Sequence, residues 1–277
     1  MTTNNGSKRM KRDDGYGRSS RFYKTPNGLT LPSVTTILSV INKPALVNWA
    51  AKVERELVME VSADLYQDTP AQLVKMSRAG WITTMQDRLG KTKAAQRELA
   101  KATEIGSQVH RLIEWTLHGE LCEKAGPSPQ ISEKAQWAFM TWEEWRHSVK
   151  LRPVYVEQVV WSDVFGYAGT MDLLAEVNDR LTVIDWKTGK AVYPEAFLQN
   201  AAYRKAFREM GHGDPESGLI VRLPKTETDP EFEVVEVPGE DECFEAFINA
   251  KRLWDWQQAI ESRKKENLIE EAESVAS

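Results

Sequence analysis

Two stretches of the sequence carry acidic and basic side chains at a spacing suited to hydrolytic chemistry. Asp172 is followed thirteen residues later by the run Asp185-Trp186-Lys187. Alternating apolar residues predict that Asp172 lies in one strand and that Asp185 ends the next strand of a meander. Neighbouring strands are about 4.8 Å apart, so the two carboxylates can converge on one cation. Because residues two apart share a face of a strand, Asp185 and Lys187 point to one site and Trp186 points away.

Carboxylate oxygens of this kind suit a hard divalent ion such as Mg²⁺ or Mn²⁺. Such an ion would lower the pKa of a bound water and offset charge on a phosphate, while Lys187 positions or deprotonates the nucleophile and stabilises the pentavalent state. The pattern therefore predicts metal-assisted hydrolysis of a phosphodiester. The alternative interpretation of an isolated Asp-x-Lys at a strand end is a surface salt bridge.

The elements expected around these residues form an α/β protein, α+β in detail, with a central mixed sheet flanked by helices and an N-terminal helical region. A hairpin is expected over residues 21–31 with Asn27-Gly28 in its turn, and Ser33 is well placed to cap a short helix. Helices are expected over 45–63, 70–79, 81–89, 92–118, 130–148, 194–210 and 241–265, with Gly80, Gly90 and Gly119 as breaks. Strands are expected over 154–161, 169–177, 181–185, 218–223 and 232–237.

Composition excludes several classes of protein. The chain has no run of about 18 apolar residues, so a membrane span is not expected. Its N-terminus lacks the apolar segment of a secretory signal, which places the protein in the cytosol. The two cysteines, Cys122 and Cys243, form no CxxC pair and are expected to be reduced, buried thiols. An iron-sulfur cluster needs about four cysteine ligands, so none is expected.

Three motifs, Gly169-x-x-Asp172, Asp185-x-Lys187-Thr188-Gly189 and Gln199-x-x-x-Tyr203, together resemble the RecB-type PD-(D/E)XK nucleases. In that family a histidine on an upstream helix completes the metal site, and His110 matches it. The resemblance implies His110, Asp172, Asp185 and the backbone carbonyl of Trp186 as metal ligands, with Lys187 as catalytic base or stabiliser. Outside this context, His110 would be interpreted as a helix-face histidine.

The same resemblance suggests further site residues. Glu157 matches an acidic residue that this group often places on the first core strand, where it binds metal directly or through water; a plain strand-surface glutamate is the alternative. Gln199 and Tyr203 share one helical face and would contact substrate or orient the site, unless they are an ordinary polar helix pair. Ser33 is a further substrate-binding candidate.

Within the superfamily, Pro32-Ser33-Val34-Thr35, the histidine helix and the run 184–188 are similar to the mitochondrial genome maintenance exonuclease and related phage exonucleases. Those relatives are single-strand-specific DNA exonucleases that thread a free end through a helical passage. By that resemblance, the basic region Lys75–Lys101, including Lys91, Lys93 and Arg97, would line the passage. This region carries seven Lys and Arg against two acidic residues, although the net charge of the chain is −5. A solvated charged face is the alternative interpretation.

The expected partner is therefore DNA, single-stranded or with free ends, in replication, recombination or repair. A phage-encoded protein in the host cytoplasm would fit. We expect a basic disordered tail over 1–20, one nuclease domain over 21–265, and an acidic tail over 266–277. Within the domain, residues 21–150 would be a mainly helical region through which DNA enters and residues 151–265 the catalytic αβ core.

Three alternatives to an exonuclease are open. A structure-specific or flap endonuclease of the same fold shares every motif. A non-catalytic DNA-binding protein is disfavoured because all the motif positions hold residues able to do chemistry. A glycosidase with paired carboxylates leaves Lys187 without a place in its mechanism. The sequence has no GxxxxGK[ST] motif, so we expect a nuclease without a motor.

Overall fold

The computed structural model describes residues 8–13, 19–41, 43–68, 77–121 and 126–276. They divide into two compact units, and the division falls inside the region predicted as one domain. The sheet unit comprises the described residues of Met1–Ile41 and Gln108–Ser277, and the helical unit those of Asn42–Ser107.

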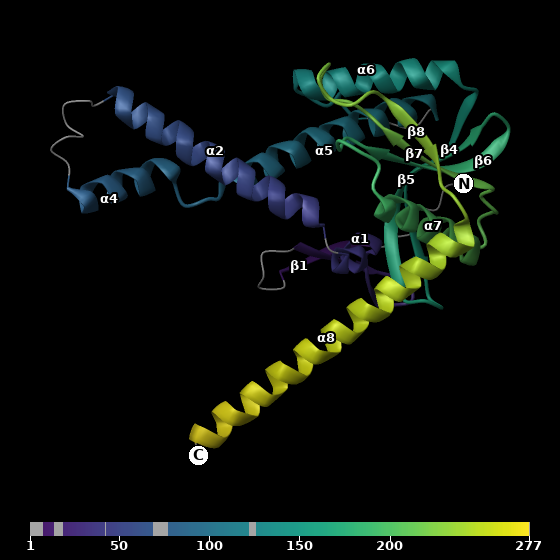
Figure 1. Ribbon diagram of the computed structural model, residues 1–277. Helices are drawn as coiled ribbons and strands as arrows, with labels where there is room; N and C mark the ends of the chain where they lie inside the picture. The colour runs from purple at the N-terminus through teal and green to yellow at the C-terminus, as the bar shows by residue number, and fades with distance from the viewer. Residues whose placement is uncertain (1–7, 14–18, 42, 69–76, 122–125, 277) are drawn as a thin grey trace. The chain divides into compact units, whose positions relative to one another are not determined.

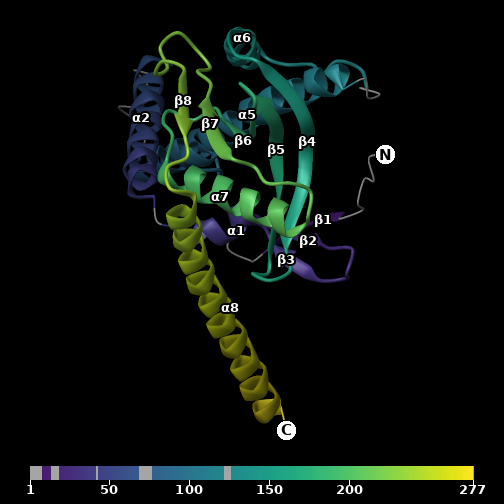
Figure 2. The same cartoon turned by 90° about the vertical axis from the view of Figure 1, so that its right-hand side faces the viewer.

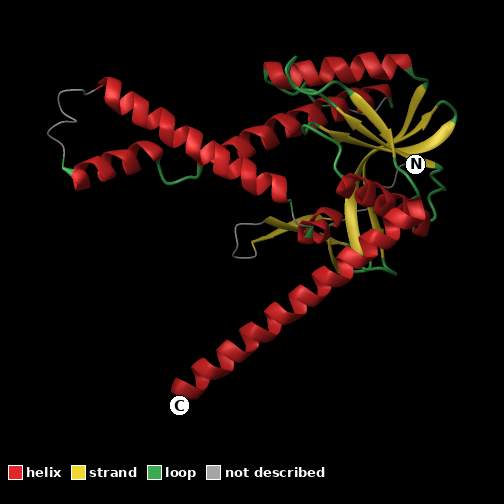
Figure 3. Cartoon of the chain, in the orientation of Figure 1, coloured by secondary structure: helices red, strands yellow, loops and turns green. Residues whose placement is uncertain are grey.

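The sheet unit is built on a five-stranded mixed sheet in the order β4-β5-β6-β7-β8, and Figure 3 draws its strands in yellow. The first three strands form the predicted antiparallel meander, β6 pairs with β7 in parallel, and β8 returns antiparallel. The strands are β4 (Leu151–Ser162), β5 (Tyr167–Val177), β6 (Arg180–Lys187), β7 (Ser217–Arg222) and β8 (Glu233–Glu236). This arrangement confirms the predicted mixed sheet flanked by helices.

Helices cover both faces of this sheet. Helix α7 (Pro194–Glu209) links β6 to β7 and covers one face, and α6 (Glu133–Ser148) lies on the other (Figures 1 and 2). On the α7 side lies one buried apolar core, to which β6 contributes Val183, α7 contributes Phe207 and α8 (Glu240–Ala276) contributes Phe247. Since apolar side chains point both ways from the central strands, β5 and β6 are almost wholly buried.

The hairpin between β5 and β6 has the turn chemistry that brings the motif strands together. Asn178 and Asp179 have φ values of 49° and 66°. Positive φ at both central residues is what a two-residue hairpin turn requires, and Asn and Asp tolerate it better than other non-glycine residues. The turn between β5, which carries Asp172, and β6, which carries Asp185, is thus determined by the two residues within it.

The N-terminal segment differs in part from prediction. The expected hairpin is present, between β2 (Ser19–Lys24) and β3 (Thr30–Pro32), with Gly28 at a φ of 83°. The predicted disordered tail over 1–20 is wrong for its described part, because β1 (Lys8–Asp13) pairs antiparallel with β2. Pairing with a neighbouring strand satisfies the hydrogen bonds of backbone groups whatever the side chains are. The amino-acid composition of the segment therefore does not predict this pairing.

Ser33 caps the short helix α1 (Val34–Ile37), as predicted, and a 3₁₀ turn, η1 (Leu38–Val40), follows. Its Oγ accepts a hydrogen bond from the Thr36 backbone N–H at 3.0 Å. Ser33 also forms a parallel bridge with Ala168 of β5, which joins the N-terminal segment to the sheet.

The helical unit contains α2 (Pro44–Asp68), α4 (Arg78–Leu89) and the first part of α5 (Ala94–Glu120). Gly90 ends α4 as predicted, with a φ of 73°. The predicted breaks at Gly80 and Gly119 are wrong, because both glycines lie inside helices. A helix tolerates such a glycine at about 1 kcal/mol relative to alanine, and Ser77 caps α4 through the Gly80 N–H. Most of the helix predicted over 70–79 lies outside the described residues.

Helix α8 runs to Ala276, eleven residues beyond the predicted end at 265, so the predicted acidic tail is helical. Glutamate, alanine and leucine in this segment are good helix formers and no glycine or proline stops it. Cys243 on α8 is a buried free thiol, as expected, while Cys122 lies outside the described residues. Among the helices that the structure describes, none is both long and apolar enough to span a membrane.

Candidate active site

Three acidic residues lie in one row across β4, β5 and β6. The last pair of β5 with β6 is Leu173 with Ile184, next to Asp172 and Asp185, so these two residues face each other where the strands separate. Glu157 of β4 lies opposite Asp172 in the register of the neighbouring pair. The meander therefore brings together carboxylates from three strands.

Helix α5 adds an imidazole to this row. His110 Nδ1 lies 3.6 Å from Asp172 Oδ1, and one ligand atom each from His110, Glu157 and Asp172 all lie within 4.8 Å of one another. Opposite ligands of one Mg²⁺ ion are about 4.2 Å apart, since each bond is about 2.1 Å. Small side-chain adjustments would let all three residues bind one ion, so the donors fit a hard divalent metal.

Glu157 owes its place in this group to an unusual backbone conformation. Its φ is 49°, in the left-handed region, although it lies within a strand. Non-glycine residues in this region store strain that the surrounding structure must hold, and such strain clusters at functional sites. The sequence left open whether Glu157 binds metal, and nothing in its residue pattern signals this conformation.

Asp185 is engaged with Lys187 and Gln199. Its carboxylate is 1% exposed and lies 2.5 Å from Lys187 Nζ. Gln199 Nε2 donates to Asp185 Oδ1 at 3.0 Å, and Gln199 Oε1 accepts from Lys187 Nζ at 3.1 Å. The structure thus brings Asp185 into the row beside Asp172 but directs its oxygens to these two partners. Metal binding by Asp185 stays a prediction.

The backbone of Trp186 holds Asp172 in place. Its N–H donates to Asp172 Oδ2 at 2.9 Å. The indole points to the opposite face, as predicted, where it packs edge-on against Trp142 and Trp145 at centroid distances of 6.0 and 5.9 Å. These buried rings fix the end of β6 and hence the direction of that N–H. Coordination by the Trp186 carbonyl stays a prediction.

The charges in the site shift one another's pKa values. Burial lowers the pKa of His110, but the charge of Asp172 and the hydrogen bond to it raise that pKa to about 9. Burial raises the pKa of Asp172, yet His110 and Lys187 bring it below its usual value. Burial raises the pKa of Asp185 to about 6 against the opposing effect of Lys187. The pKa of Lys187 is raised, because Asp185 and Asp172 outweigh the effect of burial.

Gly169 of the first motif makes room for Tyr203 of the third. A Cβ at Gly169 would lie 2.4 Å from Tyr203 Cε1, so any side chain there would displace the ring. Tyr203 is 3% exposed, and Gln199 Nε2 donates to its hydroxyl at 3.1 Å. Tyr203 is buried and Gln199 half-buried, and contact with substrate or orientation of the site stays a prediction for this pair.

The remaining candidates belong to other segments of the chain. Ser33 is 2% exposed and serves as a helix cap, and this burial argues against the predicted contact with substrate. Lys91, Lys93 and Arg97 belong to the helical unit, where both lysines are exposed. Their contact with DNA stays a prediction, and residue 75 lies outside the described residues.

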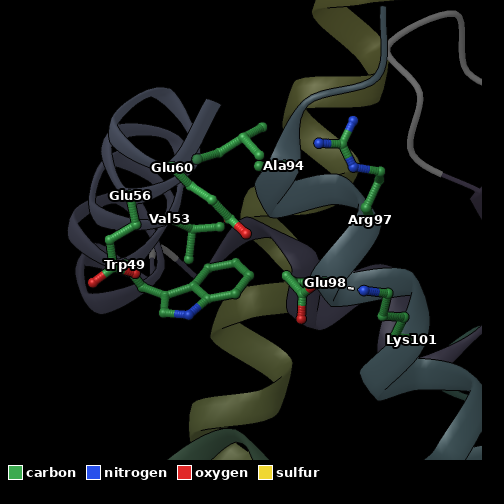
Figure 4. A pocket seen from close by; sticks show the side chains of 9 residues that line it. Trp49, Val53, Glu56, Glu60, Ala94, Arg97, Glu98 and Lys101 are labelled. Atoms are coloured by element: carbon green, nitrogen blue, oxygen red, sulfur yellow. Dashed lines mark hydrogen bonds and ion pairs between the residues drawn. The ribbon is translucent and has the colours of Figure 1, made fainter. Parts of the chain in front are cut away.

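Arg97 is engaged within the helical unit. It donates to the carbonyl of Thr92 at 2.6 Å and lines a cleft of about 470 Å³ between α2 and α5 (Figure 4). Trp49 lies on the α2 side of this cleft, and Lys101 donates to Glu98 at 2.7 Å on the α5 side. Three acidic and two basic side chains line it, so the cleft is not uniformly positive.

Comparison with known families agrees with this geometry. The family model of the PD-(D/E)XK nuclease superfamily matches residues 77–275, more than half of the chain. The match includes helix α5 with His110 and the strands β4, β5 and β6. No curated protein matches the chain. Nucleases of this superfamily use divalent metal ions, which the His110, Glu157 and Asp172 donors suit. The chain therefore belongs to the PD-(D/E)XK nuclease superfamily, with the restriction-endonuclease-like fold of that group.

Proposed function

We propose that this nuclease is a Mg²⁺- or Mn²⁺-dependent deoxyribonuclease that degrades DNA from free ends or as single strands. The observation that carries the metal-dependent chemistry is the row of Glu157, Asp172 and Asp185 with His110 at one side and Lys187 at the other. The preference for ends and single strands is supported by the sequence resemblance described above.

His110, Glu157 and Asp172 would hold the ion, with Asp185 and the Trp186 carbonyl as further ligands. The bound ion supplies positive charge at the phosphate and lowers the pKa of water. Asp172 is oriented for this role by the Trp186 N–H. The strained backbone of Glu157 turns its carboxylate toward the same group.

Lys187 would stabilise negative charge on the phosphate. Its ammonium group is held by Asp185 and Gln199 but is 31% exposed, so a phosphate can approach it. A fixed cation at the reacting group favours the transition state without reorganisation. Tyr203 and Gln199 orient this ammonium group, since both lie within one chain of hydrogen bonds.

The reaction is tested with linear DNA labelled at either end, single- or double-stranded, with Mg²⁺, Mn²⁺ or chelator. We expect label to be released from an end in the presence of metal and no release with chelator. Intact substrate under every metal condition would refute the nuclease proposal and favour a non-catalytic DNA-binding protein.

A matched pair of lysine variants tests the assignment of Lys187. K187M should lower kcat by about 10²–10³-fold, the usual effect of removing one electrostatic stabiliser. Lys190, three residues later and exposed, provides the control, and K190M should keep the parent kcat. Equal losses in the two variants would contradict the role of Lys187.

An endonuclease, including a flap endonuclease, is the alternative within the same fold. A covalently closed single-stranded circle has no end, so an exonuclease leaves it intact and an endonuclease opens it. The linear form of the same sequence is the control. Opening of the circle at the rate of the linear form would replace the exonuclease proposal with the endonuclease. A cytoplasmic location and a role in replication, recombination or repair stay predictions.

A further inference from the structure

Helix α7 contacts the sheet through a buried asparagine at an unspecified position of the Gln199-x-x-x-Tyr203 motif. Asn200 follows Gln199, is fully buried, and donates through Nδ2 to the Val183 carbonyl at 3.0 Å. Val183 on β6 is the register partner of Gly218 on β7. A Cβ at Gly218 would lie 2.0 Å from Asn200 Oδ1, so the amide lies directly over the glycine. Asn200 therefore contacts both strands at a point where β7 has no side chain.

This contact is close to the candidate active site. Val183 lies two residues before Asp185 on the same face of β6, a distance of about 6.6 Å along a strand. One residue before Asn200, Gln199 bridges Asp185 and Lys187 with hydrogen bonds of 3.0 and 3.1 Å. A donor and an acceptor about 3.6 Å apart no longer form a hydrogen bond. A small displacement of α7 at Asn200 would therefore break the bridge.

Stability alone does not account for an asparagine at this position. Among the described residues, no donor reaches Asn200 Oδ1. An unsatisfied buried amide oxygen destabilises the folded state, and apolar side chains would avoid that cost. The next two residues on α7, Ala201 and Ala202, are buried and small, which lets this part of the helix lie close to the sheet. Close approach and a polar anchor together set the position of the helix.

We propose that Asn200 and Gly218 form a positioning pair, which seats α7 so that Gln199 holds Asp185 and Lys187 in their reactive arrangement. Neither residue contacts substrate, and both act through Gln199. The inference rests on the proposed function, because the arrangement it protects is that of the nuclease site. It assigns the reason for glycine at 218 and for asparagine at 200.

The first test is a double-mutant cycle between the two residues. G218A places a methyl group against Asn200 and, at 3.1 Å, against Val237. We expect G218A to lower kcat about tenfold or more, with KM within about threefold of the parent. In the N200A background the obstructing amide is gone, so the same G218A change should alter kcat by less than about twofold. Equal effects in both backgrounds would overturn the pairing.

The second test separates positioning from general destabilisation. In a Q199A background, G218A should have little further effect on kcat, because the residue through which it acts is absent. A206G is the control, since it weakens α7 at a buried position without touching Asn200. Measured well below its melting temperature, A206G should keep kcat near the parent value. A full G218A effect in the Q199A background, or an equal decrease in A206G, would overturn the proposal.

A structural readout keeps this inference separate from the proposed function. Absence of cleavage by the parent protein would refute the nuclease activity alone. Independently, the crystal structure of G218A should show Gln199 Nε2 out of hydrogen-bond reach of Asp185 Oδ1, and that of G218A/N200A should place Gln199 where N200A alone places it. An unchanged 3.0 Å distance in G218A would overturn the inference. If G218A does not fold, N200A takes its place, and an unmoved Gln199 in N200A has the same meaning.

Discussion

Replacement of Asp172 by asparagine tests the metal-site assignment most directly. Asparagine has the same shape, and its side-chain oxygen can still accept the Trp186 N–H that Asp172 Oδ2 accepts at 2.9 Å. The second oxygen, 3.6 Å from His110 Nδ1, becomes an NH₂ group that cannot bind a cation. The variant therefore removes a ligand while it keeps the backbone contacts of β5 and β6.

The structure allows the size of the effect to be estimated. Loss of one group that stabilises developing charge lowers kcat by about 10²–10³-fold, or about 2.7–4 kcal/mol. The effect on folding should be smaller, because the variant loses the attraction of Asp172 to His110 but also relieves the burial of a carboxylate beside Glu157 and Asp185. A net change within about 1 kcal/mol corresponds to a melting-temperature shift of about 2–4 °C for a chain of this size.

The assay compares kcat on end-labelled DNA, DNA affinity and the melting temperature for D172N and for E176Q. Glu176 lies on the same strand but forms an exposed ion pair with Arg152, so E176Q makes the same chemical change away from the site. Such exposed pairs contribute about 0.2–1 kcal/mol. We expect D172N to bind DNA without cleaving it and E176Q to retain full kcat. D172N activity within tenfold of the parent, or a matching decrease in E176Q, would refute the reasoning.

Three further predictions concern the metal, DNA binding and stability. Mn²⁺ at about 100 times its Kd should stabilise the parent by about 2.7 kcal/mol, seen as a higher melting temperature, and should leave D172N unchanged. The affinity of K91A/K93A for single-stranded DNA should depend less steeply on salt. The slope of log affinity against log salt concentration should fall by about 0.7 for each phosphate that a lysine no longer neutralises. An unchanged slope would exclude both lysines from the interface. E240Q removes the negative charge that pairs with the buried Arg204 at 2.6 Å and with Arg208, so urea denaturation should show a decrease of about 3 kcal/mol in the free energy of unfolding. D255N, at an exposed ion pair, should decrease it by less than about 1 kcal/mol, and an equal decrease in the two variants would contradict the assigned burial.

Local patterns in the sequence were enough to predict the meander and most of its chemistry. Alternation over the strands and the Asn178-Asp179 turn imply that Asp172 and Asp185 come together, since both signals depend only on neighbouring residues. The placement of Trp186 on the face of β6 opposite to Asp185 and Lys187 follows from the two-residue period of a strand. The motif spacing, likewise local, led to the superfamily that the family model confirms.

Errors arose where distant contacts or whole-element context outweigh local signals. The tail predicted as disordered contains β1, which exists through its pairing with β2. Gly80 and Gly119 were expected to break helices, but the energy cost of one glycine is small beside the stability of a continuous helix. The end of α8 was placed too early, because its acidic composition suggested a tail although its residues favour a helix.

The sequence by itself determined which residue types are available for chemistry, which side chains share a face of each strand, and the family of the chain. The faces and the family follow from short-range periodicity and spacing. Only the tertiary structure decided that Glu157 joins His110 and Asp172, that Asp185 turns toward Lys187 and Gln199, and how closely α7 approaches the sheet. These features depend on register, backbone strain and packing between segments far apart in the chain. No local pattern encodes the distance between two such segments, so these features of the site appear only when the whole chain is folded.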